Sequence, residues 1–253
     1  MRTTSAVLAA TTAAALALTA LLTAPTASAA VADSTAPVVK WVDVRPETVG
    51  LYKDRATRVT IAARVTDDIG ATAVAAALVS ARAAGATQEF ALKRLSGTAK
   101  DGIWGITVFT DKGEVTGLWA GVAVAWDAAG NESPSDETAP LDEFWVKRNT
   151  IISNFNVREP AVKGSYLQMS GRLLRLDPLK GYIGYRNEAI HVLFRAAGSA
   201  TWVKVGEITT SDTGSFANTR RFRAVRDGTW VVVFDGTTLH LPEVSHRDFV
   251  DVV

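Results

Sequence analysis

The clearest strand pattern in the chain is Arg58-Val59-Thr60-Ile61-Ala62-Ala63-Arg64-Val65. Its odd-numbered positions are apolar, whereas Arg58, Thr60 and Arg64 are polar. Successive side chains of a β-strand point to opposite faces, so this period of two predicts a strand with one face in a core and the other in water. We expect the odd-numbered side chains to be buried.

The same alternation recurs along most of the chain, between turns rich in Gly, Asp, Asn and Pro. The even-numbered positions of 104–108 and of 118–126 form two further apolar stripes, which we expect to face the core. The segment 71–84 is rich in alanine, the best helix former, and could compete as a helix. Its alternation nevertheless favours a strand.

Each half of the chain yields seven short strands. The expected strands are 38–44, 58–65, 73–79, 89–95, 104–108, 118–126 and 141–147, then 151–157, 166–176, 190–196, 202–209, 215–224, 229–234 and 248–253. This number and spacing are typical of an immunoglobulin-like β-sandwich. The sequence therefore predicts an all-β protein of two tandem immunoglobulin-like β-sandwiches that follow a cleaved signal peptide.

The N-terminus predicts export. Arg2 is the only charge before Asp33, an Ala/Leu-rich stretch runs from 6 to 22, and the small residues Ala27-Ser28-Ala29 provide a cleavage site. A membrane anchor is the alternative, but threonines interrupt the stretch and no basic stop-transfer flank follows it. We expect a secreted, extracellular protein with no transmembrane segment.

The expected organisation has four parts. Residues 1–29 form the signal peptide and residues 30–37 an N-terminal linker. The first sandwich domain spans 38–149 and the second spans 150–253, with almost no connecting chain between them.

Composition excludes several classes of function. The 253-residue chain has no cysteine, which excludes a lipid-anchored N-terminus, thiol catalysis and zinc–thiolate sites, and requires stability without disulfides. Removal of Arg2, one of 27 basic residues, leaves 26 basic against 26 acidic residues. A nucleic-acid binder normally has a clear basic excess, so we expect no nucleic-acid partner.

Several segments resemble known families. The stretch 124–134, with Asp127-Ala128-Ala129-Gly130-Asn131 at its centre, resembles a strand end of bacterial immunoglobulin-like surface domains, and 65–70 resembles their matching corner. The second half is similar to an immunoglobulin-like module of secreted actinobacterial proteins of unassigned function, at 162–164, 169–173, 192–195, 198–205, 209–216, 228–230 and 234–236. The resemblance implies adhesion, spacing or ligand display outside the cell, and no particular activity.

An acidic group is the sharpest candidate site. Asp67, Asp68, Asp127 and Asn131, with Glu132 beside them, lie in loops that share one end of a sandwich. Calcium takes six to eight oxygen ligands, so these residues could form a calcium site. The alternative is an ordinary turn at 127–131, in which Asp and Asn bond their own backbone. We favour the turn and keep calcium as the one cofactor candidate.

A basic group, Arg220, Arg221 and Arg223, is the candidate ligand-binding site. Guanidinium groups suit phosphate and carboxylate, so an anionic cell-wall polymer is a conceivable ligand. The alternative, which we favour, is an edge strand whose charges prevent pairing with other sheets.

The sequence gives little support for an enzymatic function. The three histidines His191, His240 and His246 have no spacing that predicts a metal site or a general base, and no nucleophile motif is present. The loop at 177–187 is the best candidate for a functional protrusion.

The seven tryptophans raise the question of carbohydrate binding. We expect Trp104, Trp126 and Trp230 in the cores, whereas an exposed Trp119 could stack on a sugar.

The sequence thus predicts a secreted, non-enzymatic binding or structural module at or outside the cell envelope. Its expected partners are a cell-wall polymer, a carbohydrate or another surface protein. The alternatives are a calcium-dependent carbohydrate or wall-polymer binder, and a secreted enzyme or enzyme inhibitor that acts through the loop at 177–187.

Overall fold

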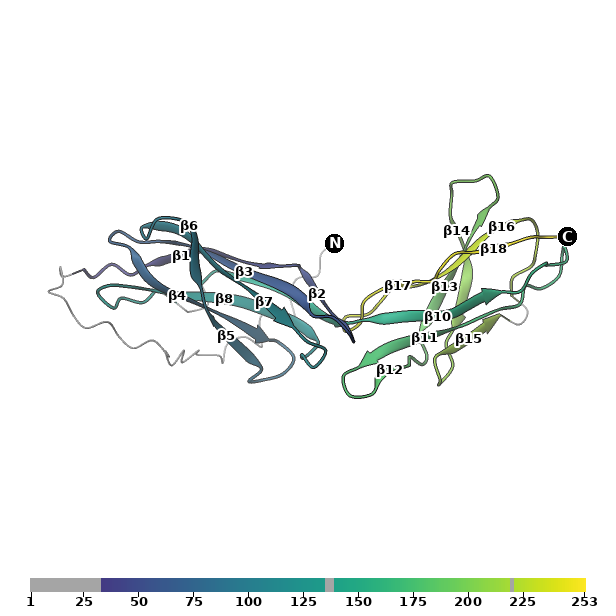
Figure 1. Cartoon of the computed structure of the whole chain (residues 1–253), viewed down its shortest axis with the longest axis horizontal. Coiled ribbons are helices and arrows are strands. Elements are labelled where there is room, and N and C mark those ends of the chain that lie inside the picture. Colours follow the sequence, from purple (N-terminus) through teal and green to yellow (C-terminus); the bar gives the residue numbers. More distant parts are fainter. Residues whose placement is uncertain (1–32, 135–138, 219–220) are drawn as a thin grey trace, which may run out of the picture. The chain divides into compact units, whose positions relative to one another are not determined.

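The regular elements of the described chain are all β-strands (Figure 1). The computed structural model describes residues 33–134, 139–218 and 221–253. These residues contain no helix long and apolar enough to cross a membrane. The predicted signal peptide at 1–29 lies outside the described residues.

The described chain divides into two compact units. Unit 1 comprises the described residues up to Val49 together with Ala56–Thr110 and Glu114–Val146, and unit 2 comprises Gly50–Arg55, Asp111–Gly113 and Lys147–Val253. Each unit consists of two facing sheets, so the prediction of an all-β protein with two tandem immunoglobulin-like sandwiches is confirmed.

In unit 1 one sheet has the strand order β1-β3-β7-β6 and the facing sheet has the order β2-β9-β8-β4-β5. The strands are β1 Val38–Arg45, β2 Thr48–Leu51, β3 Thr57–Thr66, β4 Ala71–Ser80, β5 Thr87–Ala91, β6 Lys93–Gly97, β7 Asp101–Thr110, β8 Gly117–Asp127 and β9 Leu141–Arg148. The odd-numbered apolar residues of β3 are fully buried, as the alternation predicts. The alanine-rich segment is strand β4 and not a helix.

The predicted core stripe of 118–126 is wrong. The inner face of β8 carries the odd-numbered positions, with Trp119 only 3% exposed, and Ala123 and Ala125 also buried. The reason is close packing between the sheets, because a Cβ at Gly121 would overlap Val44 of β1. The inner face therefore consists mostly of small residues, and the larger side chains that suggested a core lie on the outer face, where Trp126 is only half-buried.

The predicted strand at 89–95 is also wrong, because it is two strands in different sheets. β5 pairs with β4 in one sheet, and β6 pairs with β7 in the other. The chain crosses between them at Leu92, whose side chain is buried and whose backbone N–H donates to Val74 O. A sheet change of this kind leaves no mark in the alternation.

In unit 2 the sheet β10-β11 carries both β12 and β15 on β11, and it faces a sheet of order β14-β13-β16 with β17 and β18 on β16. The strands are β10 Thr150–Val157, β11 Met169–Asp177, β12 Gly181–Gly184, β13 Ala189–Ala196, β14 Val203–Thr209, β15 Ser215–Asn218, β16 Gly228–Phe234, β17 Glu243–Val244 and β18 Asp248–Val250. The core includes Phe155 and Leu173 together with Trp230, Val232 and Phe234 of β16, so the predicted burial of Trp230 is confirmed.

Two irregularities of the strands in unit 2 lie at its candidate site. The register between β10 and β11 shifts between Ser153 and Asn156, and Asn154 in this β-bulge has a φ of 53°. On the neighbouring strand, Gly171 leaves room for the buried ring of Phe216, which a Cβ at this position would overlap. A bulge redirects side chains that a regular strand would place elsewhere.

Candidate functional site

In the turn at 127–131, groups of the turn itself donate hydrogen bonds to the carboxylate of Asp127. Asp127 is 4% exposed, and its carboxylate accepts hydrogen bonds from the backbone N–H (2.9 Å) and the side-chain amide (2.8 Å) of Asn131. Burial acts to raise the pKa of Asp127, but these bonds, with those from the amides of Ala129 and Gly130, hold it below its usual range. Glu132 accepts a hydrogen bond from the indole of Trp126 (3.2 Å).

The second acidic loop is built in the same way. Asp67 accepts a hydrogen bond from Gly70 N (2.5 Å), and Asp68 accepts one from Ile69 N (3.1 Å). No group of three or more His, Cys, Asp or Glu side chains within residues 33–134, 139–218 and 221–253 has an arrangement that could hold a metal ion. The calcium site at Asp67, Asp68, Asp127 and Asn131 stays a prediction.

The predicted arginine group is only partly described, because Arg220 lies outside the described residues. Arg221 donates from Nη1 to Glu207 O (2.7 Å). Arg223 donates to Gly164 O (2.6 Å) and to the hydroxyl of Tyr166 (2.9 Å), and its guanidinium carbon lies 4.1 Å from the centre of the Tyr166 ring. Both described arginines therefore bond groups of unit 2 itself, and a polymer site at this group stays a prediction.

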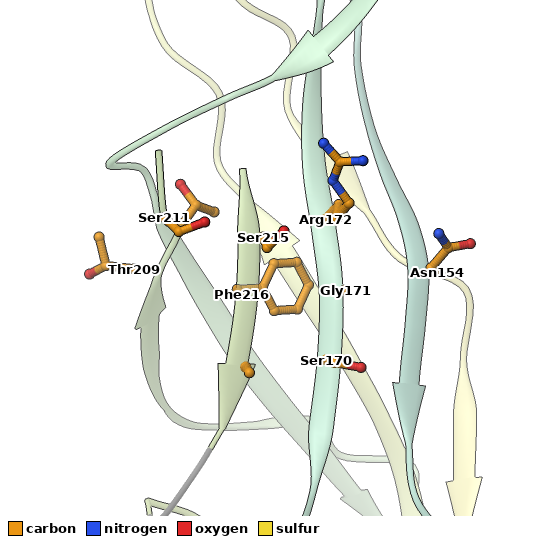
Figure 2. A pocket seen from close by; sticks show the side chains of 10 residues that line it. Asn154, Ser170, Gly171, Arg172, Thr209, Ser211, Ser215 and Phe216 are labelled. Carbon is orange, nitrogen blue, oxygen red and sulfur yellow. The ribbon is translucent and has the colours of Figure 1, made fainter. Parts of the chain in front are cut away.

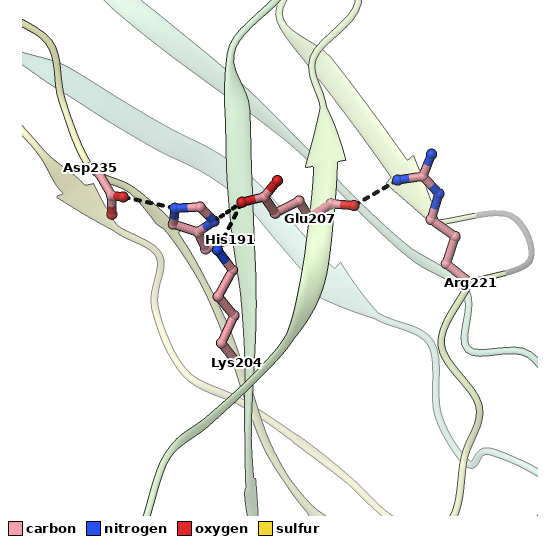
Figure 3. A network of polar contacts seen from close by, with 5 residues as sticks. All are labelled: His191, Lys204, Glu207, Arg221 and Asp235. Atoms are coloured by element: carbon pink, nitrogen blue, oxygen red, sulfur yellow. Dashed lines mark hydrogen bonds and ion pairs between the residues drawn. The ribbon is translucent and has the colours of Figure 1, made fainter.

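His191 lies between two carboxylates (Figure 3). Its Nε2 is 2.7 Å from Asp235 Oδ2, and its Nδ1 is 2.9 Å from Glu207 Oε1, a contact without hydrogen-bond geometry. Lys204 bonds the same Glu207 oxygen at 2.8 Å and holds the pKa of this carboxyl below its usual range. Because both ring nitrogens face carboxylates, neither faces a nucleophile.

His240 is buried among polar groups of unit 2. The residue is 6% exposed, and its Nδ1 lies 3.0 Å from the hydroxyl of Tyr185 and 3.3 Å from that of Thr237. Burial lowers the pKa of His240 to about 4, and the positive charges of Arg175 and Arg148 act in the same direction. The neutral ring of His240 is thus packed inside unit 2, and the sequence spacing did not predict its burial.

The segment 177–187 is a hairpin and not an open loop. β12 pairs with β11, and the carboxylate of Asp177 accepts hydrogen bonds from the backbone N–H groups of Leu179 (3.0 Å) and Lys180 (2.9 Å). These bonds hold the pKa of Asp177 below its usual range. Leu179 at the tip is 93% exposed, and a functional role of this segment stays a prediction.

Among the described residues, a shallow groove on unit 2 gathers polar side chains from several strands (Figure 2). It encloses about 590 Å³ and lies over β10, β11, β15 and the end of β14. It is lined by Asn154, Ser170, Gly171, Arg172, Thr209, Thr210, Ser211, Ser215, Phe216 and Ala217. The lining thus combines an amide, a guanidinium and several hydroxyls, with no carboxylate and no imidazole.

Sequence reasoning missed this groove. Ser170 and Arg172 alternate with buried neighbours on β11, which marks them as outward-facing but not as members of a site. Their grouping with Asn154 depends on the bulge in β10, and their grouping with Ser211 depends on where β14 ends. Neither feature is visible in a periodic pattern.

Comparison with known proteins gives only distant likeness. No family model matches the sequence, and no curated protein matches it. Among solved structures, the fibronectin(III)-like modules of CbhA from Clostridium thermocellum are 16% identical, with 83% of this chain and 94% of that chain covered and a TM-score of 0.32.

Two chimeric titin proteins also match. The Z1Z2-Z1Z2 tandem with a GRGDS peptide from fibronectin is 13% identical over 81% of this chain and 94% of its own, with a TM-score of 0.27. Z1Z2 with a KLER peptide from decorin is 14% identical over 86% of this chain and 97% of its own, with a TM-score of 0.25. TM-scores this low carry no argument, so the fold rests on the strand pairing described above.

Proposed function

We propose that this protein is an exported, non-catalytic binding or structural module that acts at or outside the cell envelope. The observation that supports it is the composition of the groove on unit 2. Its lining can donate and accept hydrogen bonds, but it contains no His, Asp, Glu or Cys. A serine or threonine nucleophile needs a neighbouring base, and general acid–base catalysis needs a titratable group within reach. The groove is therefore equipped to bind and not to react.

Four titratable groups outside the groove support the same proposal. The carboxylates of Asp127 and Asp177 bond the backbone of their own turns, and Glu207 pairs with Lys204. His240 is buried beside Tyr185. Each group has a structural partner, which is the ordinary use of such residues in a stable sandwich.

Export is supported by the N-terminal sequence, with Arg2, the apolar stretch and Ala27-Ser28-Ala29. The test is to express the full chain with a C-terminal tag in a secreting bacterial host. We expect the product outside the cytoplasm with Ala30 as its first residue. A product that stays in the cytoplasm with Met1 in place would refute export.

Binding is tested with the same exported protein. It is incubated with cell-envelope fractions, with and without a chelator, and the bound share is measured. We expect retention that the chelator does not change. No retention on any fraction would refute an envelope-binding role.

A calcium-dependent binder is the second candidate, and one observation favours it. Oδ1 of Asp67 and Oδ2 of Asp33 are buried and have no hydrogen-bond partner in the described chain, and Asn131 Nδ2 donates to Asp33 O (3.1 Å). Unsatisfied carboxylate oxygens are costly unless they bind a cation. Thermal unfolding at millimolar calcium tests this candidate. Calcium would then raise the unfolding midpoint of the parent and of the control Asp54→Asn, but not that of Asp67→Asn.

A further inference from the structure

We propose that the groove on unit 2 binds an anionic, hydroxyl-bearing glycan chain. The inference rests on the proposed function, because it assigns a ligand class to the same non-catalytic module. It depends on the orientation of the side chains that line the groove, on their charge and on the shape of the groove floor.

The outward faces of β11 and β15 present the polar side chains side by side. Arg172 pairs with Ser215 across the two strands, and Ser170 pairs with Ala217. Ser170 and Arg172 are exposed, whereas their neighbours on β11 point into the core. A row of small side chains beside a long cationic one therefore faces the solvent over the pair of strands (Figure 2).

Hydroxyl groups continue this row toward the end of β14. The hydroxyls of Ser211 and Thr213 lie 3.1 Å apart, and those of Thr213 and Ser215 also lie 3.1 Å apart. Each hydroxyl can donate one hydrogen bond and accept others. A connected series of this kind matches the successive hydroxyls of a sugar chain, which have the same mixed donor and acceptor character.

Arg172 supplies the charge selectivity. Its Nη2 donates to Thr213 O (3.0 Å), which fixes the guanidinium at the edge of the groove. A guanidinium has five N–H donors in a fork that suits carboxylate or phosphate, so one anchoring bond leaves donors for an anionic group. With no carboxylate in the lining to compete, the expected ligand carries negative charge.

Asn154 lines the groove on the side opposite to Ser211 (Figure 2). It is exposed and stands in the β-bulge with a φ of 53°, a conformation that asparagine tolerates better than most residues. Non-glycine residues in this conformation gather at ligand sites, where the strain fixes a side chain in place. The bulge thus places Asn154 among the residues that line the same groove as Arg172.

The floor is shallow and open, which favours a chain over a compact ligand. Gly171 and Ala217 have almost no side chain, and Phe216 packs beneath Gly171. Nucleic acid is a poor fit because its binding needs contacts to several phosphates, whereas this lining has one cation.

The test measures binding of the exported protein to three probes by calorimetry. The probes are a uronate polymer, a poly(glycerol phosphate) and neutral dextran. The variants are Arg172→Met and Asn154→Gly, the second of which suits the left-handed backbone and should fold. Arg158→Met is the matched control, because it removes an exposed arginine of the same unit outside the groove. Thermal unfolding verifies that each variant is folded.

We expect the parent to bind at least one anionic probe more tightly than dextran. Arg172→Met should weaken that binding by about tenfold or more, Asn154→Gly by about threefold or more, and Arg158→Met by less than about twofold. Preference for the uronate or for the phosphate polymer identifies the source of the charge.

Any of three results with the probes would overturn the inference. These are no binding of the parent to any probe, a preference for dextran, or equal affinity of Arg172→Met and the parent. Loss of binding in Arg221→Gln/Arg223→Gln with full binding in Arg172→Met would move the site to the arginine group and also overturn it. Retention on envelope fractions separates this inference from the proposed function. If Arg172→Met is retained as well as the parent, the groove is not the binding site. If the parent itself is not retained, the proposed function is refuted.

Discussion

The turn at 127–131 in unit 1 and the groove in unit 2 contain similar polar atoms and use them in opposite ways. In the turn, Asp127 is buried and bonded by Asn131 of the same short segment. In the groove, Arg172 and Asn154 come from different strands and are exposed to solvent. In these two regions, the polar groups that are close in sequence bond one another, whereas the side chains that sheet pairing brings together stay available to a ligand.

The sharpest way to test the first half of this comparison is Asp127→Ala. Removal of the carboxylate leaves the amide groups of the turn without their charged acceptor, and we expect a loss of roughly 3 kcal/mol in the stability of unit 1. Hydrogen exchange read peptide by peptide reports each unit separately. Asp68→Ala, an exposed neighbour in the other acidic loop, should cost less than about 0.5 kcal/mol.

Glycan affinity of Asp127→Ala completes this test. Because the groove lies on the other unit, we expect its affinity to be unchanged. A stability loss of less than about 1 kcal/mol would mean that the carboxylate is not committed to the turn, and would reopen the calcium interpretation.

Acid should weaken the two units in different pH ranges. The pKa of His240 is about 4 in the folded chain and about 6.5 when unfolded, so the unfolded state binds more protons between these values. Unit 2 should therefore lose up to about 3 kcal/mol as the pH falls from 6.5 to 4. Asp127, whose pKa is below its usual range, contributes stability to unit 1 that is lost only at lower pH, as the carboxylate is protonated.

The control for this acid effect is His240→Gln, which keeps a polar group beside Tyr185 but does not titrate. Urea unfolding at pH 7, 5.5 and 4 should show a smaller loss for this variant than for the parent. Parallel losses in both proteins would show that His240 is not the group responsible.

Much of the fold could be predicted because it depends on local pattern. Val59 and Ile61 alternate with polar residues, and β3 forms where the pattern places it. The pattern failed at 118–126, because Ala and Gly on an inner face signal close sheet packing that only the partner strand reveals. It failed again near Leu92, where the chain changes sheets within a continuous run.

The candidate site was less predictable than the fold. The arginines and acids that stand out as clusters in the sequence bond their own surroundings, as Arg223 does with Tyr166. The groove depends on the cross-strand pairing of Arg172 with Ser215 and on a bulge at Asn154. Register and bulges are tertiary properties, since they are set by the pairing of strands distant in sequence.

A smaller effect is expected at the floor of the groove. Gly171→Ala adds a methyl group that overlaps the buried ring of Phe216, and displacement of the ring should cost about 2 kcal/mol in unit 2. Urea unfolding measures this loss. If the overlap is the cause, the cost of the alanine should shrink in a Phe216→Leu background, and an equal cost in both backgrounds would contradict it.

The smallest effect on stability and the largest on binding should come from Arg172. Because the side chain is exposed, Arg172→Met should change stability by less than about 0.5 kcal/mol. The most direct test of the whole account is therefore the retention of Arg172→Met/Asn154→Gly on cell-envelope fractions, beside the parent and Arg158→Met. We expect the parent and Arg158→Met to be retained and the folded double variant to be released. Equal retention of all three proteins would contradict it.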